Sequence, residues 1–286
     1  MKKLIKKFLL SPLIFLNFIA SLYSQLLYFI KPKLKYYWSD SIAESNRNQT
    51  QQVNHLTKEG KKLRFKLFTP NRRCRYGVES FSIKEPETLS WIDNHKGDGV
   101  FFDIGANVGL YSIYYALSKN NKVYAFEPSV FNLALLAKNI NLNHLEKEIK
   151  IISNPLTDSN QISDFSLSIN EEGGSMSAFG VNYGHDGKPI DKFLSYKTLG
   201  FSLDYLFEKE ILNEYPSLIK IDVDGIEHLI LSGAQKVLEH PNCKTVIIEV
   251  AYNFKNQSDY IDSFMKKCGY FTNQKIENYK GYGDIT

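Results

Sequence analysis

The segment FFDIGANVGLYS, Phe101–Ser112, is the most informative part of this chain. It opens with a short apolar run that is typical of a strand buried on both faces. It then continues into VGLYSIYYALS, whose apolar spacing predicts a helix. Between the two lies a turn that holds Gly105 and Gly109, and glycine lets a backbone turn sharply and approach a ligand. A strand, a glycine turn and a helix in this order predict a unit of a parallel α/β sheet.

The same alternation of strand and helix continues along the chain. Apolar runs predict further strands, and segments with helical spacing separate most of them. The predicted strands cover residues 99–104, 122–127, 148–153, 217–222 and 245–250. The predicted helices cover residues 108–118, 130–142, 226–240 and 258–269. We therefore predict an α/β fold of the Rossmann-like, doubly wound type with a mainly parallel sheet. Residues 162–189 interrupt the pattern and are predicted to form a hairpin and loop that serve as a lid or substrate-binding insertion.

The expected organisation has three parts. Residues 1–39 form a membrane-prone helix, and residues 40–95 a linker with accessory elements. Residues 96–286 then form the α/β domain. In the middle part, residues 40–62 are polar and predict a linker or loose helix. Segments 63–68 and 78–83 alternate well enough to predict strands, and residues 85–94 predict a helix that begins near Pro86.

Composition and charge exclude several classes of protein. With 286 residues, 43% of them hydrophobic and 23% charged, the chain is neither disordered nor a disulfide-stapled miniprotein. Its three cysteines lie far apart, which argues against a zinc ribbon and favours a reducing compartment. The net charge of +4 comes from seven lysines that precede Asp40; removing them from the 35 basic residues leaves 28 against 31 acidic residues. The body of the protein is therefore not expected to bind nucleic acid.

Residues 8–30 form an apolar segment close to the length that spans a bilayer. On a helical wheel, its polar residues and the first four lysines share one side, and large apolar residues occupy the other. The polar side holds Lys2, Lys3, Lys6, Lys7, Ser11, Asn17, Ser21, Ser24 and Gln25, and the apolar side holds Leu4, Phe8, Phe15, Ile19, Leu22 and Leu26. This pattern favours an amphipathic helix that lies in a membrane interface. A spanning anchor, a helix docked on protein and a cleaved signal peptide are the alternatives.

Two acidic residues stand at the ends of neighbouring predicted strands. Asp103 ends the first strand, and Glu127 ends the second, about 20 residues on, as nucleotide-binding folds of this type require. In open parallel sheets, ligands bind beyond the carboxyl ends of the strands. A carboxylate at the position of Glu127 can accept two hydrogen bonds from a ribose diol.

These motifs carry a family resemblance. DIGANVGLYS, AFEPS and LIKIDVDGIEHLILSGA resemble the FkbM-type class I methyltransferases, which use S-adenosylmethionine, from about Lys84 to about Val250. The resemblance implies that the α/β domain of residues 96–286 binds this cofactor. It implies that Asp103, Gly105 and Asn107 border the methionine part, with Gly109 at the helix start. It also implies that Glu127 holds the ribose and that Asp158 or a neighbour lies beside the adenine.

A nicotinamide-dependent dehydrogenase is the rival interpretation, because it shares the fold and the acidic ribose ligand. Its GxGxxG fingerprint is missing, since Ala106 and Asn107 stand between the two glycines. An acid at Asp103 would repel a pyrophosphate, whereas it suits the cationic amine and sulfonium of S-adenosylmethionine. A third interpretation is that the segment is only a tight strand–helix turn.

The segment KIDVDGIEH supplies the candidates for catalysis. Asp222 is the first candidate for a base or acceptor-orienting group, with Glu227 and His228 behind it. Asp224 before Gly225 suits a tight turn, and a carboxylate at Glu227 suits the first turn of a helix. No metal site is predicted, because one segment supplies too few convergent ligands. His185, in the insertion, is a further possible base or substrate contact.

The resemblance implies transfer of a methyl group to an oxygen of a small molecule or glycan, with a hydroxyl of a surface polysaccharide or lipid-linked saccharide as the expected acceptor. We further expect a cytoplasmic enzyme that touches the cytoplasmic face of a membrane through residues 1–37. A membrane-tethered protein that binds a nucleoside cofactor without catalysis is the alternative from another class.

Overall fold

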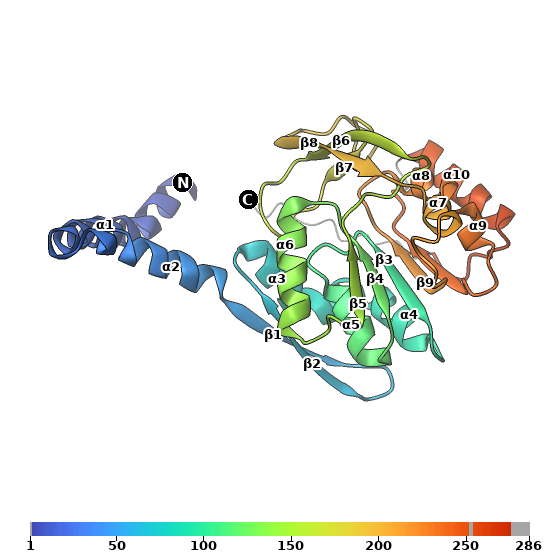
Figure 1. The fold of residues 1–286 in the computed structure, drawn as a ribbon, viewed down its shortest axis with the longest axis horizontal. Coiled ribbons are helices and arrows are strands. Elements are labelled where there is room, and N and C mark those ends of the chain that lie inside the picture. The colour runs from blue at the N-terminus through green and yellow to red at the C-terminus, as the bar shows by residue number, and fades with distance from the viewer. Residues whose placement is uncertain (1, 252–253, 276–286) are drawn as a thin grey trace. The chain divides into compact units, whose positions relative to one another are not determined.

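The computed structural model describes residues 2–251 and 254–275, and side chains from residue 12 onward within these ranges. Its contacts divide the chain into two compact units, Met1–Gln49 and Thr50–Thr286. The first unit consists of α1 (Lys2–Ile30), the short 3-10 helix η1 (Pro32–Leu34) and α2 (Tyr37–Arg47). The second unit contains all the described strands (Figure 1).

A parallel sheet of five strands forms the centre of the second unit. Its order is β10-β9-β3-β4-β5, and every neighbouring pair runs parallel. The strands are β3 (Val100–Ile104), β4 (Val123–Phe126), β5 (Ile149–Ile152), β9 (Pro216–Ile221) and β10 (Thr245–Ile248). The prediction of a mainly parallel, doubly wound sheet is confirmed. The strand order reverses at β3, which pairs with β4 on one side and β9 on the other, so a ligand crevice is expected there.

Helices cover both faces of this sheet. Successive strand residues point to opposite sides, so neighbouring residues of one strand pack on different helices. Phe101 packs on one face with helices α3 (Arg72–Lys84), α4 (Pro86–Asn94), α5 (Leu110–Lys119) and α6 (Val130–Leu142). Phe102 packs on the other face with helices α7 (Leu203–Glu208), α8 (Glu227–Ser232), α9 (Gln235–Leu238) and α10 (Lys255–Lys267). The antiparallel hairpin of β1 (Thr50–Leu56) and β2 (Lys62–Phe68) joins the first of these cores.

The prediction of a strand at residues 78–83 is wrong, because these residues belong to helix α3. The Asn71 side chain caps this helix by accepting a hydrogen bond from the backbone nitrogen of Cys74 at 3.0 Å. The buried residues Cys74, Val78 and Phe81 follow helical spacing. The period-2 alternation of the short segment was therefore accidental.

Residues 40–62 also differ from the predicted linker or loose helix, since they hold most of α2 and all of β1. In β1 only Val53 is buried, so the strand lacks the apolar alternation by which strands are predicted. The helix predicted at 226–240 is divided into α8 and α9 near Gly233. A Cβ at Gly233 would overlap the carbonyl oxygen of Thr157, so the chain packs too closely there for any larger side chain.

The insertion after β5 is more ordered than a hairpin and loop. It forms a separate antiparallel sheet, in the order β7-β6-β8, at one end of the central sheet (Figure 1). Its strands are β6 (Gln161–Leu167), β7 (Ser177–Phe179) and β8 (Leu194–Gly200). Phe165, Leu167 and Phe179 are buried and join the core that contains Phe102. The insertion is therefore fixed by apolar packing to the main domain.

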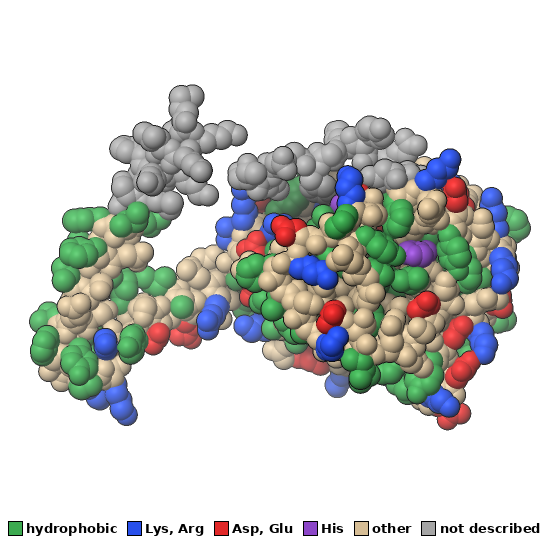
Figure 2. Space-filling model, turned by 90° about the horizontal axis from the view of Figure 1, so that it is seen from above, with side chains coloured by type: hydrophobic (Ala, Val, Ile, Leu, Met, Phe, Trp, Pro, Cys, Tyr) green, Lys and Arg blue, Asp and Glu red, His purple; other side chains and the backbone are tan. Residues whose placement is uncertain are grey.

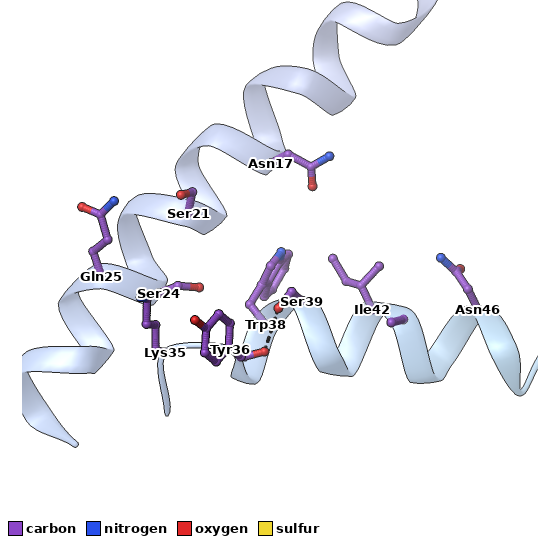
Figure 3. Close-up of a pocket in the computed structure, with 11 residues that line it drawn as sticks. Asn17, Ser21, Ser24, Gln25, Lys35, Tyr36, Trp38, Ser39, Ile42 and Asn46 are labelled. Atoms are coloured by element: carbon purple, nitrogen blue, oxygen red, sulfur yellow. Dashed lines mark hydrogen bonds between the residues drawn. The ribbon is translucent and has the colours of Figure 1, made fainter. Parts of the chain in front are cut away.

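The long N-terminal helix was predicted correctly, and its apolar side chains are exposed. The segment Pro12–Ile30 is long and apolar enough to cross a membrane, with a mean hydropathy of 1.8 and 6% of it buried. Figure 2 shows these hydrophobic side chains at the surface of this unit. The polar residues Asn17, Ser21, Ser24 and Gln25 line one groove together with Trp38, Ser39, Ile42 and Asn46 of α2 (Figure 3). The predicted polar and apolar sides of the helix also include Leu4, Phe8, Ser11 and the first four lysines, and the side chains of these residues are outside the described part of the structure.

Candidate active site

The turn after β3 packs directly against the chain that follows β9. Gly105 has a φ of +86°, and a Cβ there would overlap the carbonyl oxygen of Asp222. The backbone nitrogen of Asp222 in turn donates to Ile104 O at 3.1 Å. A Cβ at Gly109, where φ is +93°, would lie 2.6 Å from the Leu136 side chain. Glycine at 105 and 109 therefore permits both the turn and its contacts.

Glu127 is held by backbone amides at the end of β4. Its side chain is buried, with 5% exposed, and its two oxygens accept from Asn107 N and Ser129 N, each at 2.8 Å. Burial raises the pKa of Glu127 to about 8, although the two amide bonds oppose this shift. Each carboxylate oxygen has a second lone pair, so Glu127 retains the capacity to accept hydrogen bonds from a diol.

Asp103 lies beneath α5 rather than in an open crevice. It is 1% exposed, and one oxygen accepts from Ser112 Oγ at 2.6 Å. The other oxygen, Oδ1, has no hydrogen-bond partner among the described residues. Burial raises the pKa of Asp103, and the nearby charge of Lys220 opposes the shift. A buried carboxylate oxygen without a partner is an unsatisfied acceptor, and a ligand cation or hydroxyl would satisfy it.

Asp222 stands between a buried cation and a second carboxyl group. Lys220 Nζ donates to Asp222 Oδ2 at 2.6 Å and also lies 5.3 Å from the ring centre of Tyr111. Burial alone would raise the pKa of Asp222, but Lys220 and a hydrogen bond with Glu249 lower it. The charge of Asp222 in turn raises the pKa of Glu249. Lys220 therefore favours the ionised form of Asp222, and the charge of Asp222 favours the protonated form of Glu249.

Glu227 is enclosed by donors. Its Oε1 accepts from Gly225 N at 3.1 Å and from Val223 N at 3.3 Å, and its Oε2 accepts from Gln257 Nε2 at 2.8 Å. Burial raises the pKa of Glu227 to about 7. These bonds tie the turn after β9 to α10, so Glu227 supports the shape of the turn.

His228 follows Glu227 and lies among aromatic side chains. Its Nε2 is 3.5 Å from Tyr183 Oη, and its ring meets Phe254 and Tyr260 edge to face. Burial lowers the pKa of His228, and the carboxylate of Asp158 opposes this shift. The imidazole is therefore neutral near pH 7.

The insertion is fastened to the turn after β3 and to α6 by side-chain amides. Gly174 O accepts from Asn107 Nδ2 at 3.1 Å and from Asn132 Nδ2 at 3.0 Å. Asp224, at the turn after β9, accepts from the backbone nitrogens of Met176 at 2.7 Å and Ser177 at 3.3 Å. The insertion therefore covers the carboxyl ends of β3 and β9, where a lid would exclude water.

The remaining candidates lie farther from this centre. Asp158 is exposed, and its Oδ1 accepts from Thr157 Oγ1 and Ser159 Oγ, so it borders the site through its influence on His228. His185 is exposed, and its backbone packs against Gly225. Within the described ranges, no group of His, Cys, Asp and Glu side chains is arranged to hold a metal ion.

Two site residues were missed by the sequence interpretation: Glu249 and Gln257. Glu249 had a signal, because it follows an apolar strand in the same way as Glu127 does. Gln257 had none, since a polar residue in an amphipathic helix is ordinarily on its solvent face.

Comparison with known proteins settles the family. The model of the methyltransferase FkbM domain matches residues 103–272, which is more than half of the chain. The chain belongs to the FkbM methyltransferase family. The matched domain is therefore a methyltransferase domain, for which S-adenosylmethionine is the implied cofactor, and the dehydrogenase interpretation is excluded. No curated protein matches it.

Solved structures of methyltransferases are similar to this FkbM methyltransferase at low identity. The FkbM methyltransferase of Methylobacillus flagellatus is 14% identical with a TM-score of 0.43, and the match covers 68% of this chain and 46% of that one. A SAM-dependent methyltransferase of Agrobacterium tumefaciens is 11% identical with a TM-score of 0.41, covering 77% and 58%. Precorrin-6y C5,15-methyltransferase of Geobacter metallireducens is 14% identical with a TM-score of 0.37, covering 65% and 70%. This FkbM methyltransferase thus spans less than half of the Methylobacillus protein.

Proposed function

We propose that this enzyme methylates a hydroxyl group of a glycan or lipid-linked saccharide. The observation that carries the proposal is the contact of the cofactor turn with Asp222, the ionised member of a carboxyl pair. An ionised carboxylate beside the methyl donor suits an alcohol acceptor, whose hydroxyl it can orient by accepting a hydrogen bond. The rings of Tyr183, Phe254 and Tyr260 around His228 offer apolar faces of the kind on which sugars pack.

We assign the cofactor contacts to residues at the strand ends. Asp103, Gly105 and Asn107 border the methionine part, Glu127 binds the ribose and Asp158 lies beside the adenine. The unpartnered oxygen of Asp103 and the remaining lone pairs of Glu127 support these assignments. When bound, S-adenosylmethionine supplies an electrophilic methyl group on a sulfonium. The chain's own part is to align the acceptor in line with it and exclude water.

At the transfer site, Asp222 is assigned to orient the acceptor hydroxyl. Because Lys220 lowers the pKa of Asp222, this carboxylate is a weak base but a stable hydrogen-bond acceptor. Glu227 is assigned to hold the turn after β9 in place. His228 is assigned to contact the acceptor beneath the insertion.

The function is tested with glycans from cells that lack the protein. These glycans are incubated with the purified enzyme and methyl-deuterated S-adenosylmethionine, and the products are analysed by mass spectrometry. We expect glycans that gain one deuterated methyl group, bound through oxygen. A boiled enzyme is the control. Transfer only to protein, or only to lipids that carry no saccharide, would refute the proposed acceptor class.

The ribose assignment predicts a pH-dependent affinity. Binding uses ionised Glu127, whose pKa of about 8 in the free protein means that lowering the pH protonates it and weakens binding. Between about pH 9 and about pH 7 the affinity for a ribose diol should fall about tenfold. The probe is 5′-methylthioadenosine, which has the diol but lacks the ionisable amine, and the measurement is calorimetry. Glu127→Gln should bind weakly at every pH, and an equally flat profile in the wild type would contradict the assignment.

We also propose peripheral attachment of residues 1–37 to the cytoplasmic face of a membrane, with the catalytic unit in the cytosol. The exposed apolar residues of α1 and its polar stripe, which faces a groove shared with α2, support an interfacial helix (Figure 3). Lysines near an anionic surface contribute about 1 kcal/mol each, and salt screens this attraction.

Attachment of this kind predicts a specific response to washing of isolated membranes. High salt combined with alkaline carbonate should release the enzyme, and replacing Lys2, Lys3, Lys6 and Lys7 by Gln should make release easier. The fraction released is measured by immunoblotting after sedimentation. Retention until detergent is added would show a spanning anchor in place of a peripheral helix.

A further inference from the structure

Gln257, on α10, connects three elements of the transfer site. Its side chain is 2% exposed, and its Nε2 donates to Gly225 O at 2.6 Å and to Glu227 Oε2 at 2.8 Å. The same nitrogen lies 3.2 Å from His228 Nδ1. Because Gly225 O and Glu227 Oε2 are acceptors, the amide nitrogen and not the amide oxygen must face this side. The orientation of the amide is therefore fixed by its partners.

This orientation determines which nitrogen of His228 carries the proton. The two hydrogens of the amide nitrogen go to Gly225 O and Glu227 Oε2, and the nitrogen has no available lone pair, so a protonated Nδ1 would face a group that cannot accept its hydrogen. Nδ1 is consequently the unprotonated nitrogen, and the neutral ring carries its proton on Nε2. That N–H points toward Tyr183 Oη in the insertion, at a long distance of 3.5 Å.

A second observation concerns the other end of the amide. Gln257 Oε1 is buried and has no hydrogen-bond partner among the described residues. Leaving a buried acceptor unsatisfied is unfavourable. The Gln257 amide therefore uses only its nitrogen here, and this nitrogen contacts Gly225, Glu227 and His228.

We propose that Gln257 is a positioning residue that holds His228 as the Nε2-protonated tautomer, so that His228 donates a hydrogen bond to the acceptor oxygen and does not remove its proton. The second half of this inference rests on the proposed function, because it places the acceptor beside His228. The first half concerns the free enzyme alone. Glu227, Tyr183, Tyr260 and Asp158 are the titratable groups near the ring, and Asp158 is the one whose charge acts on its pKa.

The tautomer is tested without any acceptor. Full-length enzyme labelled with ¹⁵N-histidine is studied by NMR in detergent, and the His228 signals are assigned by their loss in His228→Asn. Two-bond proton–nitrogen correlations distinguish the tautomers. We expect neutral, Nε2-protonated His228 near pH 7. An Nδ1-protonated or doubly protonated ring would overturn the inference.

Two variants show whether Gln257 or Tyr183 determines the tautomer of His228. Gln257→Met keeps the approximate volume and replaces the amide nitrogen with a thioether, whose sulfur can accept a weak hydrogen bond from Nδ1, so His228 should populate both tautomers. Tyr183→Phe removes the partner of Nε2, and the tautomer should stay unchanged. Ser263→Ala, on the same helix, is the matched control, because its hydroxyl donates only to Asp259 O at 2.8 Å. Calorimetry with S-adenosylmethionine verifies that each variant is folded. If Tyr183→Phe changes the tautomer and Gln257→Met does not, the assignment to Gln257 is wrong.

Kinetics in the glycan assay with methyl-deuterated S-adenosylmethionine test whether His228 donates a hydrogen bond to the acceptor oxygen. Gln257→Met should raise the KM for the glycan about tenfold, the effect of losing one hydrogen bond. An unchanged KM with a mixed tautomer would refute donation to the acceptor. Absence of any glycan product with the wild type would refute the proposed function, while the NMR result would still decide the role of Gln257 in the free enzyme.

Discussion

Gly105→Ala should remove most of the binding of S-adenosylmethionine and destabilise the catalytic unit. The added methyl group would overlap the carbonyl oxygen of Asp222, and the φ of +86° at this position disfavours any residue with a Cβ. Strain and overlap of this kind cost about 2–4 kcal/mol together. To relieve the overlap with Asp222 O, the turn after β3 must move away from β9, and this movement displaces the cofactor contacts. We expect at least about a 100-fold loss of affinity by calorimetry and a lower urea midpoint.

Gly60→Ala is the matched control for this variant. Gly60 has a similar φ of +81°, but nothing lies within 4 Å of a Cβ built there. It should therefore show only the backbone strain, about 1 kcal/mol, and no loss of cofactor affinity. If Gly105→Ala binds S-adenosylmethionine as well as Gly60→Ala does, the close packing of the turn is not required for the site.

The inner strands of the central sheet, β9, β3 and β4, could be predicted because they are almost entirely buried. The run 99–104 is apolar throughout its centre, and β3 and β4 are buried on both faces. The accessory elements were harder, because their signals are local and weak. β1 buries Val53 alone, and α3 was mistaken for a strand because its cap at Asn71 is recognised only once the helix is known.

The residues of the candidate site likewise fall into those that the sequence predicts and those that it does not. Asp103, Glu127 and Asp222 could be predicted from their places at strand ends, since the carboxyl ends of parallel strands meet at one edge. Glu249, the partner of Asp222, could not be predicted in this way. Ile221 pairs with Ile248, so Asp222 and Glu249 follow side by side, and this neighbourhood depends on β10 lying next to β9. Strand order is a property of the whole sheet, and the sequence of either strand alone does not contain it.

The largest effect on turnover is expected from Asp222→Asn. The substitution removes the negative charge that Lys220 stabilises, and it replaces a hydrogen-bond acceptor with an amide whose nitrogen can only donate. Single-turnover rates on the glycan should fall about 100-fold or more, the size of effect that a misdirected reacting group produces. The affinity for S-adenosylmethionine should change little, because the backbone contact between Asp222 N and Ile104 O is retained.

Glu249→Gln distinguishes the two roles that a carboxyl pair can take. The charge of Asp222 favours the protonated form of Glu249; if Glu249 acts in this form, a Gln amide can replace it as donor to Asp222, and turnover should stay close to that of the wild type. If Glu249→Gln is as damaging as Asp222→Asn, the ionised form of Glu249 takes part and the pair acts as the base. Glu227→Gln should lower turnover and cofactor affinity together, because its amide oxygen can accept from Gly225 N only if its amide nitrogen faces the donor Gln257 Nε2, which disturbs the turn. His228→Ala should act mainly on the KM for the glycan. A collapse of turnover in His228→Ala with an active Asp222→Asn would move the assignment to the imidazole, since only a group that meets the reacting oxygen can change the rate without changing either affinity.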